Sequence, residues 1–161
     1  MWRAISAKGI IGPYIFLDDA RRTTTVTGEN YLEMLQKFFL PELENNALVE
    51  NCYFQQDGAP AHYARKVRDY LNQVFPERWI GCRGPLEWAA RSPDLTPCDF
   101  YLWGFLKSKV YSTRPQNLEE LEQKIRATCG IVTQDLLQSV GQECVKRWLK
   151  CLEIGGFHVE V

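Results

Sequence analysis

Short runs of β-branched and aromatic residues alternate along this chain with longer segments in which apolar residues recur every three or four positions. The runs WRAIS and IIGPYIFL, joined by a short turn, predict an N-terminal hairpin. The run LVENCYFQQ predicts a third strand that leads to Asp57, and RWIGC predicts a brief fourth strand. Strands therefore come first and recur between the helices.

Helices are predicted wherever apolar residues share one face at helical spacing. The segment TVTGENYLEMLQKFF offers Thr27 or Asn30 as a helix cap, and Pro41 is expected to kink or restart that helix. Further stripes consist of Ala64, Val67, Leu71 and Val74; of Trp103, Leu106 and Val110; of Leu118, Leu121, Ile125 and Cys129; and of Leu137, Val140, Cys144, Trp148 and Cys151. An ordered loop is expected from Gly84 to Cys98. This order of elements predicts the mixed α/β class.

Composition narrows the class of protein. With 161 residues, of which 45% are hydrophobic and 12% aromatic, the chain can bury one substantial core and is interpreted as one domain. Its six cysteines form no CxxC pair, which argues against zinc, and their apolar surroundings are typical of a reduced protein. No run approaches the roughly 20 apolar residues that span a bilayer. We expect a nuclear or cytoplasmic protein without membrane contact.

The charge is unevenly placed although the net charge is only -1. Residues 62–114 hold nine Lys or Arg against five Asp or Glu, whereas the rest of the chain is acidic. A basic middle fits a face that binds nucleic acid, and a solvated surface explains it about as well. The candidate DNA-backbone contacts on the second predicted helix are Arg65, Lys66 and Arg68, and those that bracket the loop leading to Asp99 are Arg83 and Arg91.

Two aspartates lie at positions where open α/β folds commonly place functional residues. Asp57 follows a predicted strand and Asp99 begins a predicted helix, and in open α/β sheets sites gather at the carboxyl ends of strands. Two neighbouring carboxylates repel unless a cation lies between them, and Mg²⁺ or Mn²⁺ favours such oxygen ligands. Spacing alone leaves the structural alternatives open: an aspartate before a glycine forms turns, and an aspartate at a helix start is a cap.

Two longer segments resemble a known family. FQQDGAPAHYARKVRDYL and WIGCRGPLEWAARSPDLTPCDFYLWGFLKSKVY are similar to the second and third catalytic blocks of the mariner-type transposases, which belong to the DDE/D superfamily of DNA-cutting enzymes. The matched positions are Gln55, Asp57, Ala59 and His62 in the first block and Ser92, Pro93, Asp94, Leu95, Pro97 and Asp99 in the second. Upstream, GIIGPYIF and TVTGENYLEML are also similar, so the resemblance covers nearly the whole chain.

The resemblance implies a ribonuclease H-like mixed sheet flanked by helices. It implies that Asp57 and Asp99 are the second and third catalytic aspartates and hold Mg²⁺ or Mn²⁺. His62 matches a family position, and a place near the metal or an ordinary surface role are equally compatible with it. Asp94 is expected to be structural, with its side chain capping backbone amides of the SPDL turn.

One departure from the family changes the expectation. In the family, the strand with the first catalytic aspartate lies upstream of the segment that resembles WRAIS and is central in the sheet, and we expect residues 1–161 to lack this strand. We do not expect Asp18 or Asp19 to replace this aspartate. Of the two, Asp19 is the better candidate. Either the hairpin closes on the strand at Cys52 to Gln56, or another chain supplies a strand, or the polypeptide is marginally folded.

We therefore interpret residues 1–161 as a partial DDE/D catalytic domain without the family's helix-turn-helix DNA-binding region. The expected ancestral reaction is metal-dependent cleavage and strand transfer at DNA phosphodiesters, and we expect the isolated chain to be catalytically dead. DNA is the expected partner, and a homodimer is possible. The alternatives are a non-catalytic module that binds nucleic acid or protein, and an incomplete gene model whose true product starts upstream.

Overall fold

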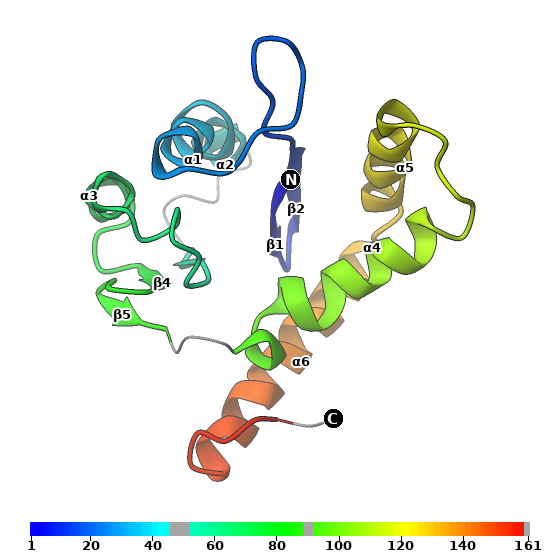
Figure 1. The fold of residues 1–161 in the computed structure, drawn as a ribbon. Coiled ribbons are helices and arrows are strands. Elements are labelled where there is room, and N and C mark those ends of the chain that lie inside the picture. The colour runs from blue at the N-terminus through cyan, green and yellow to red at the C-terminus, as the bar shows by residue number, and fades with distance from the viewer. Residues whose placement is uncertain (46–51, 89–91, 160–161) are drawn as a thin grey trace. The chain divides into compact units, whose positions relative to one another are not determined.

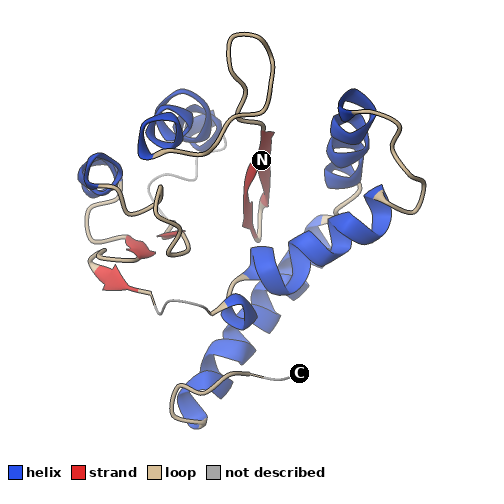
Figure 2. Cartoon of the chain, viewed as in Figure 1, coloured by secondary structure: helices blue, strands red, loops and turns tan. Residues whose placement is uncertain are grey.

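The structure is a computed structural model that describes residues 1–45, 52–88 and 92–159. It contains short strands and longer helices, as the sequence pattern predicted (Figure 2). The chain divides into two compact units, each described by itself below. The first unit comprises Met1–Trp2 and Tyr14–Arg91, and the second comprises Arg3–Pro13 and Ser92–Val161.

The predicted hairpin is confirmed by a two-stranded sheet of β1 (Trp2–Ser6) and β2 (Gly9–Tyr14), drawn in dark blue in Figure 1. Ser6 fixes its turn, because its hydroxyl oxygen accepts the backbone N–H groups of Lys8 and Gly9 at 3.2 and 3.3 Å. A small polar residue thus satisfies the amides that the chain reversal leaves outside the ladder.

The first helical run begins at a capping box. The Thr27 hydroxyl accepts the Asn30 N–H at 3.3 Å, and the Asn30 side chain accepts the Thr27 N–H at 2.7 Å. Helix α1 (Gly28–Met34) continues through a π-helical segment (Leu35–Phe39) into α2 (Leu40–Asn45). The change of helical pattern lies next to Pro41, which has no N–H to donate, so the predicted interruption is confirmed.

A second sheet has three parallel strands in the order β3 (Phe54–Gln55), β4 (Trp79–Gly81) and β5 (Leu86–Glu87). The third predicted strand is shorter than expected in the part that the structure describes, and β5 lies inside the predicted loop. Among the described residues, the hairpin and this sheet are separate sheets. The alternative in which the hairpin closes directly on Cys52 to Gln56 is therefore not found there.

Aromatic rings fill the core of the first unit. The ring of Phe39 lies 5.2 Å from that of Trp2 and 5.0 Å from that of Phe54, and Phe54 stacks on Phe75 at 5.6 Å. Helix α3 (Arg65–Val74) buries Val67 and Leu71 completely, which confirms its predicted apolar stripe. Because Phe54 belongs to β3, this core fixes the strand that leads to Asp57.

The second unit is mainly helical. A 3-10 turn (Pro93–Leu95) and a π-helical segment (Cys98–Leu102) lead into α4 (Trp103–Val110), α5 (Leu118–Gly130) and α6 (Gln134–Glu153). The predicted stripes are largely confirmed, since Leu106, Val110, Ile125, Leu137, Val140 and Cys144 are buried. Leu118 is exposed because it is the first residue of its helix.

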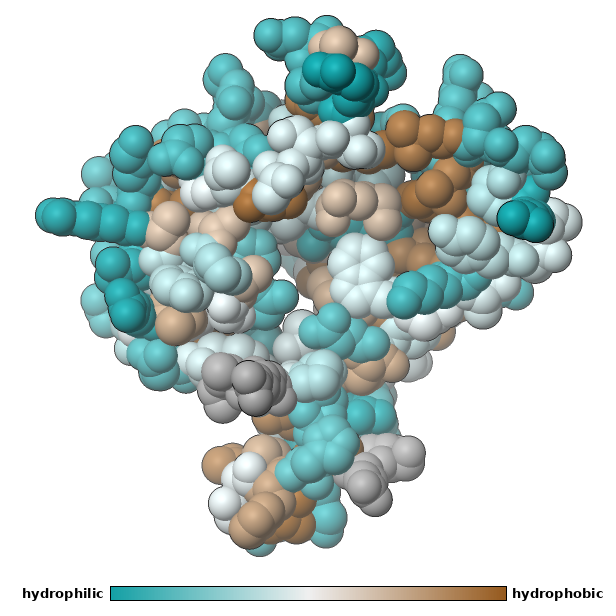
Figure 3. All heavy atoms as spheres, viewed as in Figure 1, coloured by the Kyte–Doolittle hydropathy of each residue, from teal (hydrophilic) through white to brown (hydrophobic). Residues whose placement is uncertain are grey.

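Hydrophobic side chains also reach the surface near the end of α6. Figure 3 shows them at the lower end of the molecule, and the exposed ones there include Leu149, Leu152 and Phe157. Among the described residues, no helix is both long and apolar enough to cross a membrane.

Candidate active site

Asp57 lies between β3 and the turn that leads to α3. Its Oδ1 accepts the backbone N–H of Ala59 at 3.0 Å, which confirms the predicted turn. The same Oδ1 lies 2.5 Å from Nδ1 of His62. The side chain of Asp57 is 56% exposed, whereas that of His62 is 18% exposed. The carboxylate is therefore held on one oxygen and remains open to solvent.

His62 is itself held by a buried polar network. Its ring packs on the ring of Tyr31, with centroids 4.3 Å apart, and its backbone oxygen accepts a hydrogen bond from Nε2 of Gln56 at 2.9 Å. The Tyr31 hydroxyl donates to Oε1 of Gln56 at 3.0 Å. Both Tyr31 and Gln56 are buried. We call Tyr31, Gln56 and His62 the Asp57 support.

Sequence reasoning missed Tyr31 and Gln56 and singled out Gln55 instead. A usable signal was present, because alternate residues of a strand point to the same face and Phe54 and Gln56 are both buried. A glutamine on the apolar face of a strand needs buried partners. The sequence did not reveal that Tyr31 is one of them.

The electrostatics keep Asp57 charged and Tyr31 neutral. The pKa of Asp57 is lowered mainly by its contact with the His62 side chain and also by the Ala59 N–H, while partial burial opposes both effects. Burial raises the pKa of Tyr31, so its hydroxyl stays protonated and can donate. Asp57 is therefore a carboxylate near neutral pH, which is the form that binds cations.

Asp99 is the second residue of the π-helical segment that precedes α4. Its N–H donates to Thr96 O at 2.9 Å, and it lines an open pocket of about 590 Å³. The lining residues are Pro93, Asp94, Asp99, Phe100, Arg147, His158 and Val159. The expected position at the start of a helix is confirmed.

The partners predicted for the Asp94 side chain, the backbone amides of its own turn, are wrong. The amides of its own turn bond to backbone, since Leu95 N–H donates to Ser92 O and Thr96 N–H donates to Pro93 O. Asp94 Oδ2 instead accepts the N–H of Val159 at 2.8 Å and lies 2.9 Å from Nδ1 of His158. Asp94 is structural, but it anchors the C-terminal segment.

The described residues of each unit supply some of the oxygen ligands that a hard cation such as Mg²⁺ needs, but not a full set. Carboxylate oxygens such as those of Asp57 and Asp99 are ligands that Mg²⁺ and Mn²⁺ accept. Within the described ranges, however, no group of three or more His, Cys, Asp or Glu could hold a metal. Asp57 belongs to the first unit and Asp99 to the second. Asp18 forms an ion pair with Arg22 at 2.8 Å.

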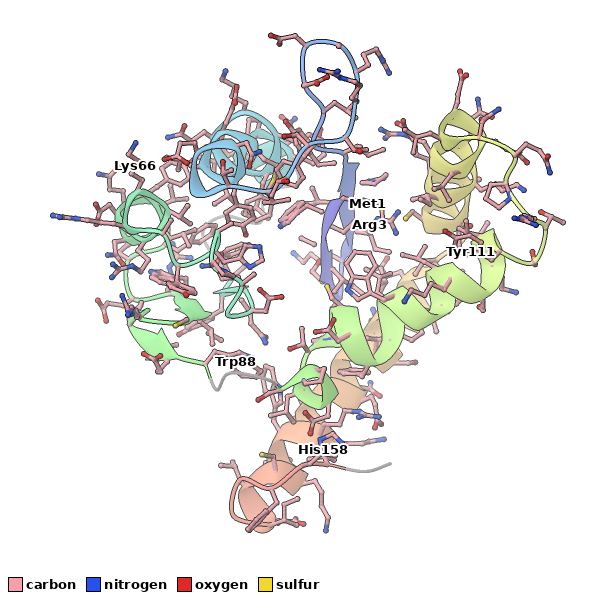
Figure 4. The ribbon with its side chains drawn as sticks, viewed as in Figure 1. Met1, Arg3, Lys66, Trp88, Tyr111 and His158 are labelled. Carbon is pink, nitrogen blue, oxygen red and sulfur yellow. The ribbon has the colours of Figure 1, made fainter. Side chains whose placement is uncertain are left out.

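Two of the predicted DNA contacts are exposed cations on α3. The side chain of Arg65 is 87% exposed and lies 3.9 Å from Asp69, and that of Lys66 is 70% exposed and lies 3.7 Å from Glu29. Figure 4 labels Lys66 on α3. Such weak, exposed ion pairs leave both cations available to a phosphate.

The other predicted cations differ in their surroundings. Arg68 donates through Nε to Tyr63 O at 3.1 Å, which gives it a structural role. Arg83 lies over the Tyr63 ring at 5.6 Å and has a positive φ of 60°. Arg91 lies outside the described residues. Arg68 and Arg83 thus both contact Tyr63, the first at its backbone oxygen and the second at its ring.

Comparison with protein-family models gives no match for this chain. Among curated proteins, the Mariner Mos1 transposase of Drosophila mauritiana is 28% identical over 107 residues, which are 66% of this chain and 29% of that protein. The transposable element Tc3 transposase of Caenorhabditis elegans is 33% identical over 106 residues, which are 64% of this chain and 30% of that protein. The match therefore spans about 30% of the length of either relative.

Solved structures share the fold over nearly the whole chain. The catalytic domain of Mos1 mariner transposase has a TM-score of 0.78 at 23% identity, with 96% of this chain and 72% of that chain covered. The Mos1 paired-end complex with the left transposon end has a TM-score of 0.80 at 24% identity, with 98% and 44% covered. The expected ribonuclease H-like class is confirmed by this likeness. This chain is thus similar in sequence to the Mos1 and Tc3 transposases and similar in fold to the catalytic domain of Mos1.

Proposed function

We propose that this chain is a transposase-derived domain for DNA cleavage and strand transfer that depends on a divalent metal. The relatives named above are transposases, and solved structures of similar fold include Mos1 paired-end complexes with Mg and with Mn. Asp57 and Asp99 are the proposed metal ligands, and DNA is the proposed substrate. A homodimer and a nuclear or cytoplasmic location stay predictions.

The observation that carries this proposal is the Asp57 support. A turn at Asp57 needs only the Ala59 N–H, yet this chain also packs a buried tyrosine and a buried glutamine behind His62. Burying polar groups is costly unless they are fully paired, so a network of this kind indicates that the direction of the carboxylate matters.

The roles of the residues follow from their surroundings. The bound metal would supply an activated water and stabilise the oxygen that leaves phosphorus. Asp57 would hold it through the oxygen that His62 and Ala59 leave open, and Asp99 would add a second carboxylate. Arg65 and Lys66 would bind the DNA backbone without reading its sequence. We expect weak activity at most from this chain, because its described residues contain no group of three ligands.

The test is Mn²⁺ binding measured by electron paramagnetic resonance, together with nicking of supercoiled plasmid. Asp57→Asn and Asp99→Asn should each weaken Mn²⁺ binding by about tenfold or more and remove any nicking that the unaltered chain shows. Asp69→Asn removes an exposed carboxylate of α3 and should change neither result. Unchanged Mn²⁺ affinity in both Asp57→Asn and Asp99→Asn would eliminate the proposed roles.

A second candidate function is a non-catalytic module that binds nucleic acid and keeps the transposase shape. The observation that favours it is the lack of a group of three metal ligands within the described part of the chain. The two functions separate in a gel-shift experiment with EDTA. Metal-independent DNA binding by a chain that neither binds Mn²⁺ nor nicks DNA would favour the module.

A further inference from the structure

The turn that leads to Asp99 is fastened to α6 through its backbone oxygens. Asp94 O accepts from Nη1 of Arg147 at 3.2 Å, and Leu95 O accepts from Nε1 of Trp148 at 3.0 Å. Cys144 Sγ also lies 3.8 Å from Leu95 O. Side chains of α6 therefore satisfy carbonyl groups of the turn, which restricts how the turn can move.

Arg147 contacts the chain on both sides of Asp99. Its Nη1 reaches Asp94 O before the aspartate, and its guanidinium carbon lies 4.4 Å from the centre of the Phe100 ring directly after it. The side chain is only 15% exposed, and Glu143 Oε1 lies 3.4 Å from its Nε. A cation–π contact that is shielded from water is stronger than an exposed one.

The same residues line the pocket at Asp99. Arg147 and Phe100 contribute to its wall, and Asp94 fixes the C-terminal residues His158 and Val159 there. Figure 4 labels His158 on the segment that follows α6. Asp99 thus lines an accessible space together with Arg147 and with Phe100, whose ring Arg147 contacts.

We propose that Arg147 is a positioning residue for Asp99, which clamps Asp94 O and the Phe100 ring so that the carboxylate is held toward the pocket. This inference rests on the proposed function, because it makes Arg147 a support for a metal-binding carboxylate. The clamp needs a planar face and a directed N–H at the same time. Arginine has both, whereas lysine has only the charge.

The deciding experiment is hydrogen exchange measured by mass spectrometry on the 161-residue chain. In Arg147→Lys and Arg147→Gln, exchange should rise by about tenfold in peptides that cover residues 96–102 and should stay unchanged in α5. Lys146→Gln is the matched control, because Lys146 is the exposed neighbour and also approaches Glu143, at 3.8 Å. Arg147→Lys decides the matter if Arg147→Gln does not fold.

Two exchange results would overturn the inference. One is exchange in Arg147→Lys that equals that of the unaltered chain. The other is an increase spread evenly over α4 and α5, which indicates general packing rather than a clamp on Asp99.

Mn²⁺ affinity of the same variants separates this inference from the proposed function. Both Arg147 variants should weaken Mn²⁺ binding by several-fold, in the same direction as Asp99→Asn. If Asp99→Asn weakens binding and the Arg147 variants do not, the positioning role is wrong and the function stands. If Asp57→Asn and Asp99→Asn both leave binding unchanged, the function fails, and the exchange result alone decides whether Arg147 fixes this segment.

Discussion

The hydroxyl of Tyr31 joins α1 to Gln56, which lies 25 positions later in the chain and directly precedes Asp57. Tyr31→Phe keeps the buried ring and removes the donor, so Oε1 of Gln56 loses this partner. We expect the free energy of unfolding to fall by about 1–3 kcal/mol, the cost of an unpaired buried acceptor. Urea denaturation measures it. Tyr111→Phe, at a side chain 60% exposed, should have little effect, and equal losses in both variants would contradict this account.

The Asp57 carboxylate should make the free energy of unfolding depend on pH in the acid range. Its folded pKa lies below the ordinary value of 3.8, chiefly because of His62. Its contribution is therefore present above about pH 4 and is lost as pH falls through the lowered folded pKa. Urea denaturation at a series of pH values should show a steeper acid loss of stability for the unaltered chain than for Asp57→Asn. Parallel profiles for the two proteins would refute the prediction.

At the scale of elements, α1 and α3 meet where each begins. A Cβ placed on Gly28, the first residue of α1, would lie 2.6 Å from the Cβ of Ala64, the N-cap of α3. Gly28→Ala should therefore destabilise the protein by about 1–3 kcal/mol through overpacking. Since His62 lies shortly before α3, the same change should also disturb the Asp57 support.

Gly104 in α4 is the matched comparison. A Cβ there would meet nothing within 4 Å, so Gly104→Ala should stabilise the protein by about 0.5–1 kcal/mol through lower backbone entropy in the unfolded state. Thermal unfolding of the two variants measures both effects. An unchanged or higher melting temperature of Gly28→Ala would show that the close approach at Gly28 does not constrain the fold.

At the scale of the whole molecule, the net charge of -1 gives DNA no general attraction, so binding must come from local groups of cations. DNA affinity should fall steeply with salt concentration as counterions are released. Replacing Arg65 and Lys66 by Gln should weaken binding to all sequences alike and lower the salt slope by about one for each phosphate that is no longer neutralised. The same change at Lys146 and Lys150 is the control. Equal effects of the two pairs would remove α3 from the DNA-binding face.

Much of the fold could be predicted because its information is local. The helical spacing of Val67 and Leu71 places both on one face, and both are fully buried. The turn at Asp57 follows from an aspartate that precedes a glycine, and the capping box follows from Thr27 and Asn30. Strand β5 could not be predicted in this way, because a two-residue strand depends on its neighbour β4 rather than on a pattern of its own.

The sequence by itself determined the order of elements, the apolar faces of the helices and the places of Asp57 and Asp99 at element ends. Only the tertiary structure decided which side chains hold those places. Tyr31 and Gln56 stand behind His62, Asp94 binds the residues after α6, and Arg147 reaches a ring that lies 47 positions earlier in the chain. Local periodicity fixes which face of an element is buried, but the partner of a buried polar group is fixed only when distant segments pack together.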